Sequence, residues 1–234
     1  MITAASNSRI KRLVQLNQKS KLRRTEDVFL AEGVKMFLEA PREQLQEVYV
    51  SESFLEKCSC REHLEEVGYE VVSDSVFSKI SDTCTPQGVL CVLKQFHYNI
   101  EEMLRDKAPL FLLLENIQDP GNLGTMLRTG EGAGVSGIIM SRDTVDLYNP
   151  KVIRSTMGSI YRVPFYYADD FAAAVHQVQQ AGVSVYAAHL RGKNSYACQD
   201  YTKGTAFLIG NEGNGLREET AELADCYIRI PMEG

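Results

Sequence analysis

The polar and charged side chains best suited to act on a ligand are concentrated in residues 115–129, ENIQDPGNLGTMLRT. The stretch follows five consecutive apolar residues, Leu110–Leu114, which predict a strand that is buried on both faces. Open α/β sheets bind their ligands at the carboxyl ends of the strands. The stretch therefore lies where a binding site is expected.

A helix is predicted to begin inside this stretch and to present a charged side chain. Residues 119–121, Asp-Pro-Gly, predict a turn, and Asn122 is the residue that we expect to cap the helix. Gly121, Thr125 and Arg128 recur at helical spacing, so small residues and one guanidinium share one side of the helix. An ordinary strand–turn–helix with a solvated arginine is an equal alternative from these residues alone.

Three blocks of the sequence resemble the signatures of one enzyme family. The blocks are 116–129 (NIQDPGNLGTMLRT), 208–216 (LIGNEGNGL) and 230–232 (IPM). In this order and at these separations they resemble the three signatures of the SpoU/TrmH family of RNA ribose methyltransferases, within the knotted SPOUT superfamily. The resemblance implies transfer of a methyl group from S-adenosylmethionine to a ribose 2′-hydroxyl of RNA, without a metal.

The matched positions imply roles for three residues. Arg128 is the family's key arginine by position, Asn122 would orient substrate and loop, and Glu212 would hold Arg128 or the ribose. The reaction needs the hydroxyl oxygen aligned behind the methyl group and relief of its proton. Because a guanidinium stays protonated in proteins, we expect Arg128 to bind the flanking phosphate and to favour the alkoxide rather than to act as a base.

The resemblance also implies a pocket for S-adenosylmethionine in a bent conformation. Its predicted residues are His189, Leu190, Gly210, Asn211, Ile230 and Met232. The loop 210–215 follows a predicted strand and opens a predicted helix, and its glycines permit close approach of backbone to a ligand, although a bare loop has the same pattern. His189 is a candidate base, but a lone histidine near a strand end is more often structural.

The third signature is shorter here than in the family. There it continues past Ile-Pro-Met into a Ser-Leu-Asn segment and a closing helix, which complete the knot and the cofactor pocket. The 234 residues end before that segment. We expect the natural chain to continue, and the alternative, loss of part of the site, would favour a non-catalytic RNA-binding protein on the same fold.

The glycines at 132, 134 and 137 match the dinucleotide fingerprint G-x-G-x-x-G. That fingerprint binds pyrophosphate only when a strand precedes the glycines and a helix follows them. Here the predicted order is reversed, helix first and strand second. The glycines therefore predict a tight helix-to-strand connection and argue against a dehydrogenase.

The N-terminal segment is basic on a chain whose net charge is −6. Residues 1–24 contain no acidic residue and seven basic ones, which are Arg9, Lys11, Arg12, Lys19, Lys21, Arg23 and Arg24. Ile10, Leu13 and Leu16 have helical spacing, so the basic residues are expected on the outer face of a helix and in the loop after it. Such a cluster favours contacts with RNA phosphates, and a merely solvated face is the alternative.

Alternation of strands and helices along the chain predicts an α/β protein with two domains. Residues 1–95 form the first, 96–107 a linker and 108–234 the second, for which strands are predicted at Ser184–Ala188 and Thr205–Ile209. The pattern Lys-x-Arg at 21–23 followed by Phe-Leu-Ala-Glu-Gly at 29–33 resembles the family's L30e-like substrate-binding domain. The resemblance implies a SPOUT methyltransferase domain with a mostly parallel sheet, a homodimer, and a substrate in large-subunit ribosomal RNA, with transfer RNA left open.

Composition places the protein in the cytoplasm. No run approaches the roughly 18 apolar residues of a membrane span, and residues 1–16 lack the hydrophobic region of a signal peptide. The six cysteines show no C-x-x-C pair, so reduced thiols are expected. Cys58, Cys60 and His63 have spacing that raises a zinc alternative, but a second ligand pair is missing.

Overall fold

The computed structural model describes residues 1–231. The chain divides into two compact units that are each built from two separate segments. The first unit comprises Met1–Phe96 and Asp146–Tyr161, and the second comprises His97–Val145 and the chain from Arg162 onward. The polypeptide therefore crosses between the units three times.

The first unit is built on a four-stranded mixed sheet in the order β1-β4-β2-β3. Its strands are β1 (Val28–Glu32), β2 (Leu45–Ser51), β3 (Glu70–Val72) and β4 (Val89–Lys94). The central strand β4 is antiparallel to β1 and β2, whereas β2 and β3 are parallel. The sheet is thus part of a small α/β unit, as the alternation of elements predicted.

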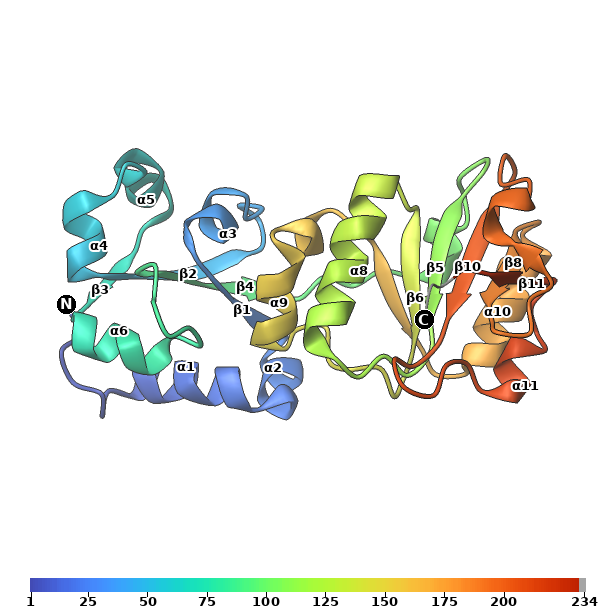
Figure 1. Ribbon diagram of the computed structural model, residues 1–234. Helices are drawn as coiled ribbons and strands as arrows, with labels where there is room; N and C mark the ends of the chain where they lie inside the picture. Colours follow the sequence, from blue (N-terminus) through green and yellow to red (C-terminus); the bar gives the residue numbers. More distant parts are fainter. Residues whose placement is uncertain (232–234) are drawn as a thin grey trace. The chain divides into compact units, whose positions relative to one another are not determined.

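Helices cover both faces of this sheet (Figure 1). One face carries α1 (Ser8–Gln18), α2 (Ser20–Glu26) and α6 (Asp74–Ile80), and the other carries α3 (Val34–Leu38), α4 (Glu52–Lys57) and α5 (Arg61–Val67). The α1 residues Ile10, Leu13 and Leu16 are at most 1% exposed, and they pack with apolar side chains of the sheet and of α6. Helical spacing in the N-terminal segment therefore correctly predicted which face of α1 is buried.

One segment of the first unit comes from the middle of the chain. Residues 146–161 lie within the predicted second domain, yet they pack with the first unit, where α9 (Pro150–Thr156) lies against β1. The Arg23 guanidinium donates to a carboxylate oxygen of Asp146 at 2.6 Å. Nothing in the local sequence predicts that this segment packs with the first unit, because it has the pattern of an ordinary turn and short helix.

The second unit is built on a seven-stranded sheet in the order β7-β6-β5-β10-β8-β11-β9. Its strands are β5 (Leu110–Leu114), β6 (Gly137–Ser141), β7 (Phe165–Ala168), β8 (Ser184–Ala188), β9 (Asn194–Ser195), β10 (Thr205–Ile209) and β11 (Cys226–Arg229). Every neighbouring pair is parallel, which confirms the predicted parallel sheet. The bounds of β5, β8 and β10 match the predicted strands.

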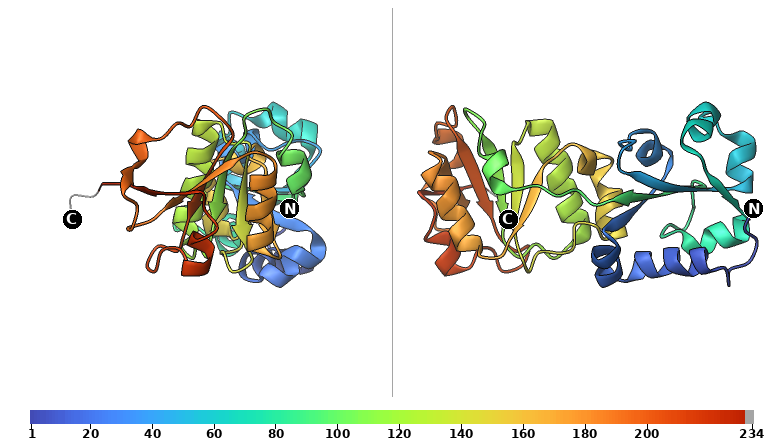
Figure 2. Two further views of the ribbon diagram at one scale, coloured as in Figure 1. Left: turned by 90° about the vertical axis from the view of Figure 1, so that its right-hand side faces the viewer. Right: turned by 180° about the vertical axis from the view of Figure 1, so that it is seen from behind.

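Helices lie on both faces of this sheet as well. They are α7 (Ile100–Met103), α8 (Pro120–Ala133), α10 (Phe171–Gln180) and α11 (Glu218–Ala221). Figure 2 shows α8 and α10 on opposite sides of the strands. Phe111 of β5 packs in one cluster with Val175 of α10, whereas Leu112 faces Gly130 of α8. Strand β5 is thus covered on both faces, which explains its uninterrupted apolar sequence.

The strand order reverses next to β5. Strands β6 and β7 extend the sheet on one side of β5, and β10, β8 and β11 extend it on the other. In open parallel sheets such a reversal opens a crevice at the carboxyl ends of the two central strands, where ligands bind. The loops that follow β5 and β10 therefore meet at the expected ligand position.

Helix α8 begins earlier than predicted, and its cap is a different residue. Asp119 is the N-cap, because its side chain accepts a hydrogen bond from the backbone N–H of Asn122 at 2.8 Å. Pro120 takes the first helical position, where a missing N–H costs nothing. The prediction that Asn122 caps the helix was wrong, and its side chain lies in the first turn instead. Gly134, with φ of 72°, ends the helix and begins the turn into β6, as predicted for the glycine-rich stretch.

No helix within residues 1–231 combines the length and the apolar character that a membrane span requires.

Candidate active site

Glu212 joins the loops that follow β5 and β10. Its carboxylate accepts hydrogen bonds from the backbone N–H groups of Gln118, at 3.1 Å, and Asp119, at 3.0 Å. It also accepts one from the side-chain amide of Asn122 at 3.3 Å. Two of the three predicted catalytic residues, Asn122 and Glu212, are therefore in direct contact although they lie far apart in the sequence.

Asn211 shapes the loop after β10 and connects it to the loop after β5. Its Oδ1 accepts hydrogen bonds from the backbone N–H groups of Gly213 and Asn214, both at 3.0 Å. Its Nδ2 donates to the carbonyl oxygen of Asn116 at 2.8 Å, and Asn116 has a left-handed φ of 53°. The side chain of Asn211 therefore uses both of its functional groups within the protein.

The loop after β6 completes the junction. The Ser141 hydroxyl accepts a hydrogen bond from the backbone N–H of Asn116 at 2.8 Å, and the Gln118 side chain donates to the carbonyl oxygen of Asp143 at 2.6 Å. The Arg217 guanidinium forms an ion pair with the Asp143 carboxylate. Three loops from three neighbouring strands thus form one hydrogen-bonded network.

Glu115 is a functional neighbour that sequence reasoning missed. It is 1% exposed, and its carboxylate accepts hydrogen bonds from the backbone N–H of Arg217, at 2.8 Å, and from the Thr220 hydroxyl. A buried carboxylate is costly unless it is hydrogen-bonded, and here it is paired at the start of α11. A charged residue directly after a buried strand was the available signal.

An open hollow lies beside this network. Its lining residues are Gln118, Asp119, Pro120, Asn122, Asn211, Glu212 and Gly213. Most of its polar groups come from the first turn of α8 and from the loop after β10. The hollow is therefore placed to receive a polar ligand at the crevice.

Arg128, the third predicted catalytic residue, lies on the exposed side of α8 together with Thr125. The Thr125 hydroxyl donates to the carbonyl oxygen of Gly121, one turn earlier in the helix, at 2.8 Å. Within residues 1–231 the structure records neither a hydrogen bond nor an ion pair of the Arg128 guanidinium. Glu212 bonds to the loop after β5 rather than to Arg128, so the guanidinium remains free for a ligand.

Hydrogen bonds favour the ionised form of two carboxylates of the site, Glu212 and Asp143. Burial acts to raise the pKa of Glu212, but hydrogen bonds from the backbone N–H groups of Asp119 and Gln118 outweigh it and lower that pKa. Burial opposes ionisation of Asp143 too, and hydrogen bonds from Ser141 and Arg217 lower its pKa nevertheless. Both groups therefore serve as hydrogen-bond acceptors rather than as acids.

The predicted cofactor residues follow three neighbouring strands. His189 and Leu190 come after β8, Gly210 and Asn211 after β10, and Ile230 after β11. Leu190 is 88% exposed and Ile230 is 55% exposed, so both present apolar surface after the carboxyl ends of their strands. Met232 lies outside the described residues.

His189 has a structural position. Its backbone N–H donates to the carbonyl oxygen of Ile228 at 3.0 Å, and its ring lies 5.0 Å from that of Tyr227. Its Nδ1 accepts a hydrogen bond from the backbone N–H of Arg191 at 3.1 Å. A neutral ring that accepts at Nδ1 carries its proton on Nε2, so it has no second lone pair for use as a base.

The seven basic residues of the N-terminal segment fall into two groups. Arg9 forms an ion pair with Glu70 at 2.8 Å, and Arg12 pairs with Glu26 at 2.6 Å and with Glu47 at 2.8 Å. Arg23 is also paired, with Asp146. The other four side chains are exposed and have no recorded carboxylate partner within residues 1–231. They are Lys11, Lys19, Lys21 and Arg24.

Arg23, expected to contact RNA, is buried instead. It is 3% exposed, and its guanidinium donates to the carbonyl oxygen of Leu16 at 2.6 Å as well as to Asp146. The guanidinium therefore lies in the interior of the first unit, where its hydrogen bonds join the end of α1 to Asp146. Burial of this kind cannot be read from a cluster of basic residues in a sequence.

The zinc alternative gains no support. Within residues 1–231 no three or more His, Cys, Asp or Glu side chains gather in a way that would hold a metal ion. Burial and the neighbouring Cys58 raise the pKa of the Cys60 thiol, which disfavours the thiolate that binds zinc. The His63 ring packs against the edge of Phe37, 4.8 Å between centroids.

The parallel sheet, the crevice at its switch point and the separate N-terminal unit define a two-part α/β protein with a ligand site at the carboxyl edge of the second sheet. Comparison with known families agrees with this division. Residues 109–234 match the SpoU rRNA Methylase family, and residues 7–91 match the MRM3-like substrate binding domain. The chain belongs to the SpoU rRNA Methylase family.

Individual relatives resemble the chain over nearly its whole length. It is 30% identical to the 23S rRNA (guanosine(2553)-2'-O)-methyltransferase RlmP of Bacillus subtilis, with 100% of the chain and 91% of the relative covered. The AdoMet-bound rRNA methyltransferase of Sinorhizobium meliloti is 29% identical, with a TM-score of 0.83, and the match covers 100% of the chain and 89% of that structure. The SpoU methyltransferase AviRb of Streptomyces viridochromogenes shares the fold, with a TM-score of 0.87 at 23% identity and coverage of 97% and 90%.

The two glycines of the loop after β10 give a matched pair of variants. A Cβ added at Gly210 would lie 2.2 Å from backbone atoms of Gly215 and Leu216, whereas the nearest described atom to one added at Gly213 is Asn211 Oδ1 at 3.6 Å. We expect Gly210→Ala to displace the loop at a cost of about 1–3 kcal/mol of unfolding free energy. Gly213→Ala should leave stability and loop hydrogen exchange unchanged, and equal effects of the two variants would contradict the close approach.

The lowered pKa of Glu212 gives a pH-dependent contribution to stability. We expect Glu212→Gln to lower the unfolding free energy by about 1 kcal/mol at pH 7, a modest value because the carboxylate is exposed. A carboxylate with a depressed pKa stabilises the fold above its unfolded pKa of about 4.3, and the contribution disappears as pH falls through the folded value. Thermal unfolding at several pH values should show that the stabilities of the native protein and of Glu212→Gln become equal below the folded pKa of Glu212. Glu222→Gln, at an exposed carboxylate after α11, is the control and should match the native protein throughout.

Proposed function

We propose that the protein transfers a methyl group from S-adenosylmethionine to a ribose 2′-hydroxyl of RNA, with 23S ribosomal RNA as the substrate. The observation that carries the proposal is the junction at Glu212, which bonds to Asn122 in the first turn of α8. The same helix carries Arg128, whose guanidinium has no recorded partner within residues 1–231. The relatives RlmP and the AdoMet-bound enzyme of Sinorhizobium meliloti support the reaction type and the methyl donor.

The residues of the crevice fit the methyl donor. The loop backbone at Gly210 and Asn211 would contact its polar groups, and the exposed Leu190 and Ile230 side chains would contact its apolar surface. When bound, S-adenosylmethionine supplies an electrophilic methyl group on a sulfonium. The protein's contribution is to hold the ribose hydroxyl in line with that group.

Arg128 supplies positive charge where negative charge develops. Its guanidinium binds the phosphate next to the target ribose and lowers the cost of removing the hydroxyl proton. Asn122 donates its amide hydrogen to Glu212, so its Oδ1 is left to accept a hydrogen bond from the ribose. Glu212 acts as a positioning residue, because it bonds to the loop and to Asn122.

The first unit binds the RNA through its unpaired cations. Lys11, Lys19, Lys21 and Arg24 contact phosphates, whereas Arg9 and Arg12 are already neutralised by carboxylates. The net charge of −6 weakens non-specific binding to RNA. The RNA therefore contacts the side of the unit that carries these four unpaired cations. The protein works as a homodimer in the cytoplasm.

Loss of the Arg128 guanidinium tests the reaction. We expect Arg128→Ala to lower methyl transfer to 23S ribosomal RNA by about 100-fold or more, since charge stabilisation of this kind contributes about 10²–10³ in rate. Affinities for RNA and for S-adenosylmethionine should change only a few fold. Transfer of radioactive methyl groups measures the rate, and Arg105→Ala, at an exposed arginine after α7, is the control. Methylation of transfer RNA alone would contradict the assigned substrate.

The two groups of basic residues predict different salt dependences. Lys11→Gln and Lys21→Gln should each lower the slope of log affinity against log salt by about 0.7–0.9, because each removes one phosphate contact. Arg12→Gln should leave the slope nearly unchanged, since its charge is already paired. Filter binding of ribosomal RNA fragments at several salt concentrations measures the slopes. Equal changes of the slope in all three variants would contradict the division into paired and unpaired basic residues.

A further inference from the structure

A second hollow lies in the first unit and shares no lining residue with the crevice. It has a volume of about 400 Å³, within the range of small-ligand sites, and it borders β2 and the start of β3. β3 pairs with β2 only from Tyr49 to Ser51, so residues 46–48 border the hollow without a strand on that side. The site lies next to α1, which contributes Arg9 and Arg12.

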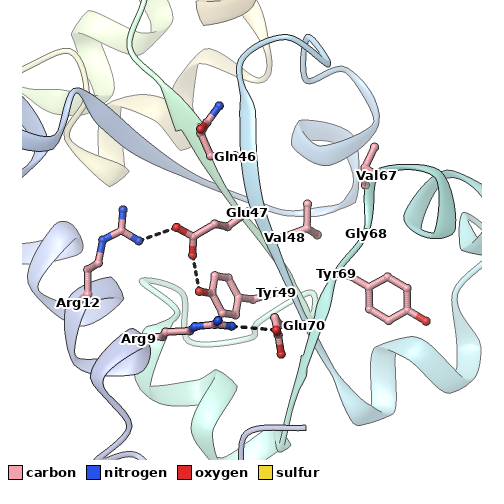
Figure 3. Close-up of a pocket in the computed structure, with 10 residues that line it drawn as sticks. All are labelled: Arg9, Arg12, Gln46, Glu47, Val48, Tyr49, Val67, Gly68, Tyr69 and Glu70. Carbon is pink, nitrogen blue, oxygen red and sulfur yellow. Dashed lines mark hydrogen bonds and ion pairs between the residues drawn. The ribbon is translucent and has the colours of Figure 1, made fainter.

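Charged side chains gather on one side of β2 in this hollow (Figure 3). The Glu47 carboxylate accepts hydrogen bonds from Arg12, at 2.8 Å, and from the Tyr49 hydroxyl. The Glu70 carboxylate accepts one from Arg9 at 2.8 Å. Glu47 has both of its oxygens engaged, so Glu70 is the carboxylate that retains capacity for a ligand.

The Arg9–Glu70 pair offers donors and acceptors side by side. Its side chains are 57% and 45% exposed, and the structure records one hydrogen bond between them and no other for either side chain within residues 1–231. A guanidinium has five N–H donors, and a carboxylate has about four acceptor positions. Most of this capacity therefore faces the hollow or solvent.

We propose that this hollow binds an unpaired guanine base of the substrate RNA. The Watson–Crick edge of guanine presents the O6 acceptor next to two donors, N1–H and the N2 amino group. The Arg9 guanidinium complements O6, and the Glu70 carboxylate complements the two donors. Adenine, cytosine and uracil do not place two adjacent donors on that edge, so they fit the pair less well. The inference rests on the proposed function, because it assumes an RNA substrate.

RNA is favoured over a peptide because of the surroundings of the hollow. Lys11 lies on the same helix, and Lys19, Lys21 and Arg24 follow directly, all exposed and without a recorded carboxylate partner among the described residues. Phosphate contacts position a nucleic acid, whereas contacts to base edges specify its sequence. The exposed cations of α1 and α2 and the Arg9–Glu70 pair supply these two kinds of contact on the same unit.

The Arg9–Glu70 pair can be changed without loss of the fold. Exposed ion pairs contribute little to stability, so Glu70→Gln and Arg9→Gln should remain folded. Glu65→Gln is the matched control, because Glu65 is an exposed carboxylate, 63% accessible, that pairs with Arg61 on α5 and does not line the hollow. Thermal unfolding of each variant shows whether the fold is kept.

The experiment measures binding of short fluorescent RNA oligonucleotides to the full chain by anisotropy. The oligonucleotides are uridine-rich and differ only in a central guanosine, inosine or adenosine. We expect the guanosine oligonucleotide to bind about 10-fold more tightly than the other two, since inosine lacks the N2 amino group. Glu70→Gln and Arg9→Gln should remove this preference, and Glu65→Gln should keep it.

Three results would overturn the inference. They are equal binding of the three oligonucleotides by the native chain, an unchanged guanosine preference in Glu70→Gln, and no binding of any of them. The readout is independent of methyl transfer. A native chain that prefers guanosine but methylates no RNA would therefore contradict the proposed function alone, and an active enzyme without the preference would contradict only this inference.

Discussion

The parallel pairing of β5 with β10 is the constraint on which the site depends. Thr205 to Ile209 pair in register with Leu110 to Leu114, although almost a hundred residues separate the two strands. The pairing sets the carboxyl ends of both strands at one edge, and the reversal of strand order opens the crevice there. Loops that follow these strands must then meet, and the Glu212 carboxylate joins them through hydrogen bonds to backbone groups of the loop after β5.

Two carboxylates at this edge have different tasks that follow from their burial. Glu115 is buried, and its hydrogen bonds to Arg217 and Thr220 fix the start of α11. Glu212 is exposed, and its bonds fix the first turn of α8. With both loops fixed by carboxylates, Arg128 is not needed to hold either of them. Under the proposed function its charge acts on the ligand, where a guanidinium already bound to a carboxylate would be less effective.

Local patterns in the sequence predicted the parts of this arrangement that depend on local physics. The apolar run Leu110–Leu114 gave the bounds of β5, because a strand covered on both faces needs no polar alternation. The cap of α8 was assigned to Asn122 instead of Asp119, since both residues are good caps and only the position of the proline favours the earlier one. The family signatures implied that Glu212 holds Arg128 or the ribose, whereas in the structure Glu212 accepts a hydrogen bond from Asn122, a contact that the spacing of the residues does not contain.

Ion pairs between residues far apart in the sequence limited the prediction for the first unit. A cluster of seven basic residues in 24 suggests a uniform RNA-binding surface, but carboxylates from distant strands neutralise Arg9 and Arg12, and Asp146 binds the buried Arg23. Charge density along a sequence measures neither burial nor pairing. The pairing also changes what the arginines can do, because a guanidinium beside a carboxylate no longer attracts phosphate strongly but presents donors next to acceptors. Such a surface distinguishes the edges of bases, a task for which an unpaired cation is poorly suited.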